Sequence, residues 1–151
     1  MLPKLENELD IEIFGLMQEI ELLELFKPIS DNNLIKLNEL YASLVTKFQV
    51  KLANAVLNLA NLEKELPKTI EKRGKKGFDY TNVDNYGHDA FCWNVRNTRV
   101  EGVKESYIND MISAAKKHKL EKIKRLQKDM WETIRAFRDE DYSRKYSNQL
   151  T

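Results

Sequence analysis

The sequence predicts an all-α fold: a mostly antiparallel bundle of four to five helices, including one or two very long helices and a long central connector. Only five glycines and three prolines occur in 151 residues, and so few breakers favour helices over β structure. Apolar residues recur every three or four positions over most of the chain, which is the period of a helix with one buried face. The length is typical of one domain, so we expect a single helical domain over residues 1–151.

The first helix is expected over residues 3–26. Pro3 suits the first helical position, and Pro28 disfavours helical backbone at the residue before it. One apolar stripe comprises Leu9, Ile13, Leu16, Ile20 and Leu23, and a second set widens it, comprising Ile11, Phe14, Met17, Leu22 and Leu25. Because the apolar residues cover more than one face, we expect this helix to touch more than one neighbour. A glycine inside a helix lowers its stability by about 1 kcal/mol relative to alanine. Gly15 is therefore interpreted as marking a place where another helix approaches closely.

The second helix is expected over residues 31–66, with Ser30 or Asp31 as its N-cap and Pro67 as its end. Its apolar stripe follows a heptad pattern with one stutter near Leu52. The stripe comprises Leu34, Leu37, Tyr41, Leu44, Phe48, Leu52, Ala55, Leu59, Leu62 and Leu66. Two interpretations remain open. The stripe is either ordinary bundle core, or the seam of a long antiparallel hairpin or a dimer.

A connector is expected over residues 67–87, followed by helices at about 88–95, 99–116 and 120–142. Thr98 precedes Glu101 by three residues, which is the spacing of a capping box at a helix start. The basic run 116–119 interrupts the apolar phase. Residues 99–142 therefore form either one helix with an exposed turn or two helices.

Charge is distributed unevenly along the chain. Residues 1–31 carry two lysines and eight acidic residues, whereas residues 67–128 carry fifteen basic and eight acidic residues. The two segments either neutralise each other within the fold, or the basic segment faces an anionic partner such as RNA. The candidate anion-binding residues are Lys72, Arg73, Lys75, Lys76, Arg99, Lys116, Lys117 and Lys119.

A short motif singles out Arg96 and Asn97, which are followed after three residues by Glu101 and then Gly102. This pattern resembles the signature of HEPN domains, which are helical bundles that include many RNA-cleaving proteins. Their motif is an arginine, often followed by asparagine, then four to six residues and a histidine. The resemblance implies Arg96, Asn97 and Glu101 as catalytic residues of a metal-independent endoribonuclease. Glu101 stands where the family has the histidine. The resemblance therefore implies a binding or regulatory member of the family more readily than an active ribonuclease.

Several functions are not expected. Asp84, His88, Asp89 and His118 fit no familiar metal-ligand spacing, and no glycine-rich phosphate loop is present, so we expect no metal and no cofactor. His88 and Cys92 are interpreted as structural, Cys92 as a small apolar residue. No apolar run of about 18 residues exists, and no secretory signal is visible, so we expect no membrane partner and a cytoplasmic location.

The function expected from these features is that of a non-catalytic helical interaction module. It would act through the apolar face of residues 34–66 and the basic central segment, on a protein partner or a second copy. The alternative is a HEPN-like RNA-binding protein or ribonuclease centred on Arg96.

Overall fold

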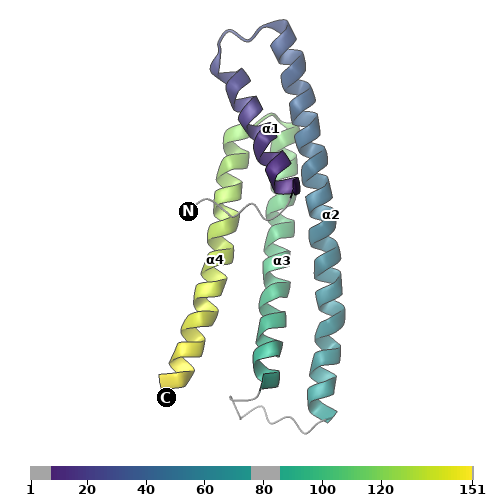
Figure 1. Ribbon diagram of the computed structural model, residues 1–151, viewed down its shortest axis with the longest axis vertical. Helices are drawn as coiled ribbons and strands as arrows, with labels where there is room; N and C mark the ends of the chain where they lie inside the picture. Colours follow the sequence, from purple (N-terminus) through teal and green to yellow (C-terminus); the bar gives the residue numbers. More distant parts are fainter. Residues whose placement is uncertain (1–7, 76–85, 151) are drawn as a thin grey trace. The chain divides into compact units, whose positions relative to one another are not determined.

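The computed structural model describes the backbone of residues 8–75 and 86–150 and the side chains of residues 8–64, 96–137 and 139. Its elements are α1 (Glu8–Leu25), α2 (Asp31–Lys75), α3 (Tyr86–Lys116) and α4 (Leu120–Leu150), and no strand occurs within these ranges. Figure 1 shows the helices and the short turns that join α1 to α2 and α3 to α4. The expected all-α fold with very long helices is confirmed.

Helix α2 extends further than the sequence predicted. It continues through Pro67 to Lys75, although an interior proline removes a hydrogen bond and costs about 3 kcal/mol. Leu62, Leu66 and Ile70 follow one another at intervals of four, so the apolar phase is unbroken across the proline and favours continuing the helix. The expected connector 67–87 is therefore wrong at both ends, and residues 76–85 lie outside the described part of the chain.

The two short helices expected at 88–95 and 99–116 form one helix. Helix α3 runs without interruption from Tyr86 to Lys116, and residues 96–98 contain neither glycine nor proline to end it. Helix α4 continues beyond residue 142 to Leu150. The question of one or two helices over residues 99–142 is answered by a turn between Lys116 and Leu120.

The turn between α1 and α2 follows the residues that predicted it. Helix α1 ends at Leu25, before the cis peptide bond that joins Lys27 and Pro28. The backbone N–H of Asn33 donates to Ser30 Oγ at 3.2 Å, which is the bond of an N-cap side chain. Ser30 as N-cap of α2 is confirmed.

The turn between α3 and α4 has the hydrogen bonds of a Schellman motif. The N–H of Lys119 donates to the Ala114 carbonyl at 3.0 Å, and the N–H of His118 donates to the Ala115 carbonyl at 3.0 Å. His118 has a φ of 54°, the left-handed conformation that glycine or asparagine usually supplies at this position. A histidine ends the helix here, which explains why the sequence shows no breaker.

The chain divides into two compact units. The first unit comprises Met1–Ala53 and Ser106–Trp131, and the second comprises Asn54–Glu105 and Glu132–Thr151. In the first unit, α1, the start of α2, the end of α3 and the start of α4 share one core. Its buried side chains are Ile13, Met17, Ile20, Leu37, Tyr41, Leu44, Phe48, Ile108, Met111, Ile112, Ala114, Ala115, Leu120, Ile123 and Met130.

The heptad stripe of α2 is core where it passes through the first unit. Leu37, Tyr41, Leu44 and Phe48 are each at most 4% exposed, whereas Leu34 at its start is 50% exposed. The side chains that cover the stripe over this length belong to the chain itself. The bundle-core interpretation therefore describes residues 37–48.

The second unit contains fewer described side chains. Ala55 on α2 and Ile134 on α4 are buried. The Arg99 guanidinium on α3 lies over the Phe137 ring of α4, 4.3 Å from its centroid. This cation–π contact links two helices of the unit.

Gly15 does not mark a close helix contact, contrary to the expectation. A Cβ built at Gly15 meets no atom within 4 Å, and the same holds for Gly102 on α3. Neither glycine is required by the packing of the chain.

Candidate functional site

The residues of the Arg96 motif lie inside a helix. Arg96, Asn97 and Thr98 follow Tyr86, the first residue of α3, by ten or more positions. The expected capping box at Thr98 is therefore wrong, because backbone N–H groups this far inside a helix are bonded within it. The same Thr-x-x-Glu spacing occurs here within a continuous helix.

The motif residues point in different directions from α3. Each helical residue adds about 100° of rotation, so Glu101 lies about 140° around the axis from Arg96 and about 7.5 Å along it. Asn97 and Glu101 are four residues apart and share a face. Within one copy of α3, the arrangement brings Asn97 and Glu101 together and separates Arg96 from them.

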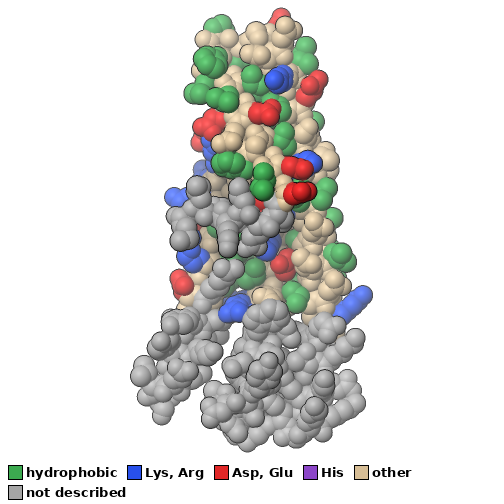
Figure 2. All heavy atoms as spheres, in the orientation of Figure 1, with side chains coloured by type: hydrophobic (Ala, Val, Ile, Leu, Met, Phe, Trp, Pro, Cys, Tyr) green, Lys and Arg blue, Asp and Glu red, His purple; other side chains and the backbone are tan. Residues whose placement is uncertain are grey.

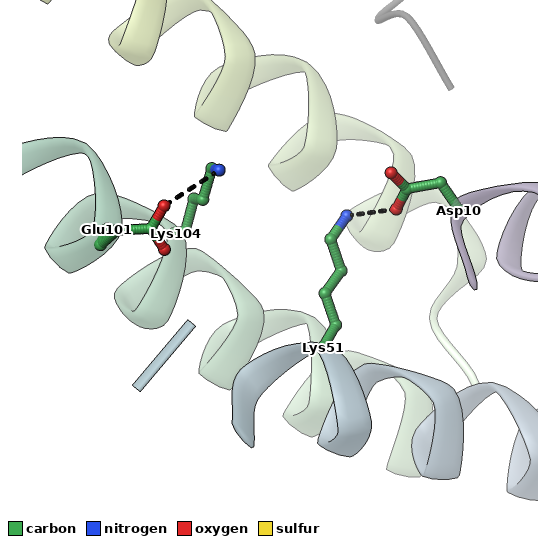
Figure 3. Close-up of polar contacts among 4 residues, drawn as sticks. All are labelled: Asp10, Lys51, Glu101 and Lys104. Carbon is green, nitrogen blue, oxygen red and sulfur yellow. Dashed lines mark hydrogen bonds and ion pairs between the residues drawn. The ribbon is translucent and has the colours of Figure 1, made fainter. Parts of the chain in front are cut away.

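The Glu101 carboxylate is engaged by a neighbour on its own helix. Lys104 Nζ lies 3.3 Å from Glu101 Oε1, and the side chains are 31% and 13% exposed. Figure 3 shows the two side chains meeting one turn apart. Arg96 and Arg99 also have interaction partners. Of the motif residues, Arg96 and Glu101 are thus engaged in contacts within the chain.

The basic residues singled out in the sequence fall into separate groups. Lys116, Lys117 and Lys119 are exposed around the α3–α4 turn in the first unit. The backbone of Lys72, Arg73 and Lys75 lies in the last turns of α2, but their side chains, and all of Lys76, lie outside the described residues. The side chains of His88 and Cys92 also lie outside them. Among the candidates whose side chains the structure describes, the three lysines of the turn lie together and Arg99 lies apart from them in the second unit.

Lysines of α2 and α4 neutralise part of the acidic α1. Lys51 lies 2.8 Å from Asp10, Lys47 lies 2.6 Å from Glu12, and Lys124 on α4 lies 3.0 Å from Glu21. Figure 3 shows Lys51 reaching from α2 to Asp10 on α1. Lys47 and Lys51 lie outside the basic segment 67–128, so among the described residues Lys124 with Glu21 is the one pair that joins this segment to the acidic segment 1–31.

A polar cluster that the sequence did not reveal is centred on Tyr41. Its hydroxyl donates to Glu24 Oε1 at 2.8 Å, and its ring stacks on the imidazole of His118. Burial, together with the hydrogen bond to Glu24 and the charge of that carboxylate, raises the pKa of Tyr41 well above its ordinary value of 10.0. The signal available beforehand was a tyrosine in a stripe of leucines, since a buried hydroxyl needs a partner.

An exposed apolar surface lies on one side of α1. Ile11, Phe14, Leu22 and Leu25 are 56%, 44%, 58% and 67% exposed. At about 100° per residue they fall within an arc of about 80°, centred about 130° from the buried Ile13, Met17 and Ile20. We call these four residues the outer face of α1. Figure 2 shows exposed apolar side chains over this part of the molecule, with acidic side chains among them.

The outer face is the second apolar side that the sequence of α1 predicted. Its apolar pattern indicated contact with more than one neighbour. The structure supplies a neighbour for the core side but leaves the four side chains of the outer face 44–67% exposed. Contiguous exposed apolar residues on one side of a helix are typical of interaction surfaces.

Comparison of the chain with protein-family models, with curated proteins and with solved structures gives no significant match. Among the described residues, no helix combines the length and apolarity needed to cross a bilayer. The inference of function therefore rests on the surfaces and contacts of the chain.

Proposed function

We propose that this protein is a non-catalytic helical interaction module that binds a protein partner through the outer face of α1. The observation that carries the proposal is the exposure of Ile11, Phe14, Leu22 and Leu25 on one arc of a helix whose other side is core. Full burial of each such side chain is worth about 1.5–3 kcal/mol. A partner that covers the outer face would gain much of this free energy.

The α2 stripe is a poorer candidate for the binding surface. The sequence pointed to the face of residues 34–66, but Leu37, Tyr41, Leu44 and Phe48 are buried by the chain's own helices. A partner could reach these side chains only after the first unit opened. The exposed face of α1 needs no such opening, so the proposal is placed there.

The HEPN-like alternative has less support from the described contacts. Its resemblance rests on Arg96, Asn97 and Glu101, and the Glu101 carboxylate is paired with Lys104. A general base must be able to reach the proton that it removes. We therefore favour the interaction module, and keep RNA cleavage as a test.

Site-specific photo-cross-linking tests the proposed function. A photoreactive amino acid replaces Gln18, which lies within the arc of the outer face, or Gln49, an exposed control position on α2. In cells that produce the protein, we expect protein adducts from position 18 but not from position 49. The double variant Phe14→Ser/Leu22→Ser should abolish them. Adducts that survive this variant, or none at position 18, would refute the proposal.

A further inference from the structure

The polar border of the outer face is acidic on both sides. Helix α1 contains six acidic residues and no lysine or arginine. By helical rotation, Glu8, Glu12 and Glu19 follow one edge of the outer face and Glu21 lies at the other. All four side chains are exposed. A partner on the outer face therefore meets carboxylates at both edges.

Two of these carboxylates have basic partners and two do not among the described side chains. Lys47 pairs with Glu12 and Lys124 with Glu21, whereas no ion pair involves Glu8 or Glu19 within residues 8–64, 96–137 and 139. Among the described side chains, Glu8 and Glu19 thus contribute two carboxylates to their edge of the outer face that no lysine or arginine pairs with. It is the edge best able to select a partner by charge.

We propose that the occupant of the outer face of α1 is an amphipathic helix of another protein, whose apolar stripe is bordered by lysine or arginine. This inference rests on the proposed function and adds the chemistry of the partner. A helix that lays an apolar face on another helix presents residues at intervals of three and four. Ile11 and Phe14 are three residues apart, as are Leu22 and Leu25, and the exposed Gln18 lies midway between the two pairs. The basic border of the docked helix would meet Glu8 and Glu19.

Charge argues against the other occupants. A second copy of α1 would place carboxylates against carboxylates, and like charges across an interface disfavour pairing. Nucleic acids present phosphates, and their binding requires lysine and arginine rather than an acidic border. Anionic lipid surfaces are disfavoured for the same reason. A basic helix is the complement that remains.

Gly15 leaves room for a close approach at the border of the outer face. It lies about 20° beyond Leu22, at the edge of the arc, and a Cβ at this position meets no atom within 4 Å. Glycine inside a helix costs about 1 kcal/mol relative to alanine, and a close approach of another backbone is one use of it. The intramolecular packing does not use this gap, whereas a docked helix would.

Two designed peptides of the length of α1 test the inference with the whole protein. Both carry the same leucine stripe, bordered by lysines in one and by glutamates in the other. Binding is measured by fluorescence anisotropy at low and at high salt. We expect the lysine-bordered peptide to bind about fivefold more tightly, as a few surface ion pairs would give, and the preference to shrink in high salt.

Three variants locate the effect. Phe14→Ser/Leu22→Ser should remove binding of the lysine-bordered peptide, and Glu8→Lys/Glu19→Lys should reverse the preference between the peptides. The matched control, Glu39→Lys/Glu63→Lys, changes two exposed glutamates of α2 by the same charge and should leave the preference intact. Circular dichroism verifies that each variant is folded.

Other outcomes would overturn the inference in distinguishable ways. Equal binding of both peptides, lost in Phe14→Ser/Leu22→Ser, would refute the basic partner and leave the proposed function standing. No peptide binding, or binding unaffected by that variant, would refute the docked helix, while the cross-linking at Gln18 decides the proposed function separately. A dimer in sedimentation that Phe14→Ser/Leu22→Ser dissociates would identify a second copy as the occupant.

Discussion

Tyr41 and His118 stack ring on ring across the first unit, with centroids 4.5 Å apart and planes 11° from parallel. The contact joins the middle of the α2 stripe to the turn between α3 and α4. The hydroxyl of Tyr41 extends the link to α1 through Glu24. One buried tyrosine thus connects α1, α2 and the turn that starts α4.

Substitutions at His118 separate the two roles of this residue. His118→Ala removes the stacked ring, worth about 0.5–1.5 kcal/mol, and keeps a β-carbon in the left-handed conformation. His118→Gly also removes the ring but relieves the backbone cost of about 1–2 kcal/mol. We therefore expect the glycine variant to be about 1 kcal/mol more stable than the alanine variant. Urea unfolding measures both, and an alanine variant as stable as the glycine variant would contradict the helix-ending role.

The raised pKa of Tyr41 predicts a pH dependence with a defined sign. Because the pKa is higher in the folded state, the unfolded chain loses this proton first, and the contribution to stability falls as the pH rises through 10. At neutral pH, Tyr41→Phe should cost about 1 kcal/mol for the lost hydrogen bond to Glu24. Above pH 10 the wild type should lose up to about 1.4 kcal/mol of stability per pH unit relative to Tyr41→Phe, so the difference between them should vanish and change sign by about pH 11.

Urea unfolding of both proteins between pH 7 and pH 11 measures the effect. The other tyrosines and the lysines titrate in both proteins, so they cancel in the difference between them. Glu24→Gln at neutral pH serves as a control, because its amide oxygen can still accept from Tyr41. A difference between wild type and Tyr41→Phe that stays constant over this range would contradict the shifted pKa.

The sequence predicts helices more reliably than it predicts where they end. Period and phase place helices over all four elements, although α3 was expected as two shorter helices, and Ser30 correctly marks the start of α2. Pro67 wrongly predicted the end of α2, and Thr98 wrongly predicted a helix start. Each is a local signal, whereas the apolar phase of the helix continues past both residues. His118 shows the reverse case, since a helix ends at a residue with no breaker signal.

The features that the sequence did not predict depend mostly on contacts between distant parts of the chain. The pairing of Tyr41 with His118 depends on how four helices pack, and no local spacing encodes it. The exposure of the outer face is of the same kind, because the apolar pattern of α1 cannot tell which side receives a neighbour. At Arg96 the motif spacing is visible in the sequence, and the pairing of Glu101 with Lys104 has its own local signal, because the two residues are three positions apart.

Ribonuclease assays separate the interaction module from the HEPN-like alternative. We expect purified protein to leave single-stranded RNA of mixed sequence intact, because the Glu101 carboxylate is paired with Lys104. Arg96→Ala is the comparison, together with Lys104→Ala, which releases the carboxylate. RNA cleavage by the wild type that Arg96→Ala abolishes would establish the alternative, and the interaction module would then no longer be the leading function.

Gly15 and Gly102 form a matched pair with opposite expectations for binding. Both lie inside helices, and a Cβ at either position meets nothing within 4 Å. Each substitution by alanine should therefore raise the free energy of unfolding by about 0.5–1 kcal/mol, since alanine loses less backbone freedom on folding. Urea unfolding of each variant measures this gain, and a loss of stability at either site would show that the position is crowded.

Only Gly15 borders the outer face of α1. A docked helix that uses the gap at Gly15 would meet the added methyl group, so Gly15→Ala should weaken binding of the lysine-bordered peptide while stabilising the protein. Gly102 lies on α3 in the second unit. Gly102→Ala should therefore stabilise the protein without changing its affinity for the lysine-bordered peptide. Equal affinities of the two variants would show that no backbone approaches α1 at Gly15, because a change in stability alone affects both variants alike.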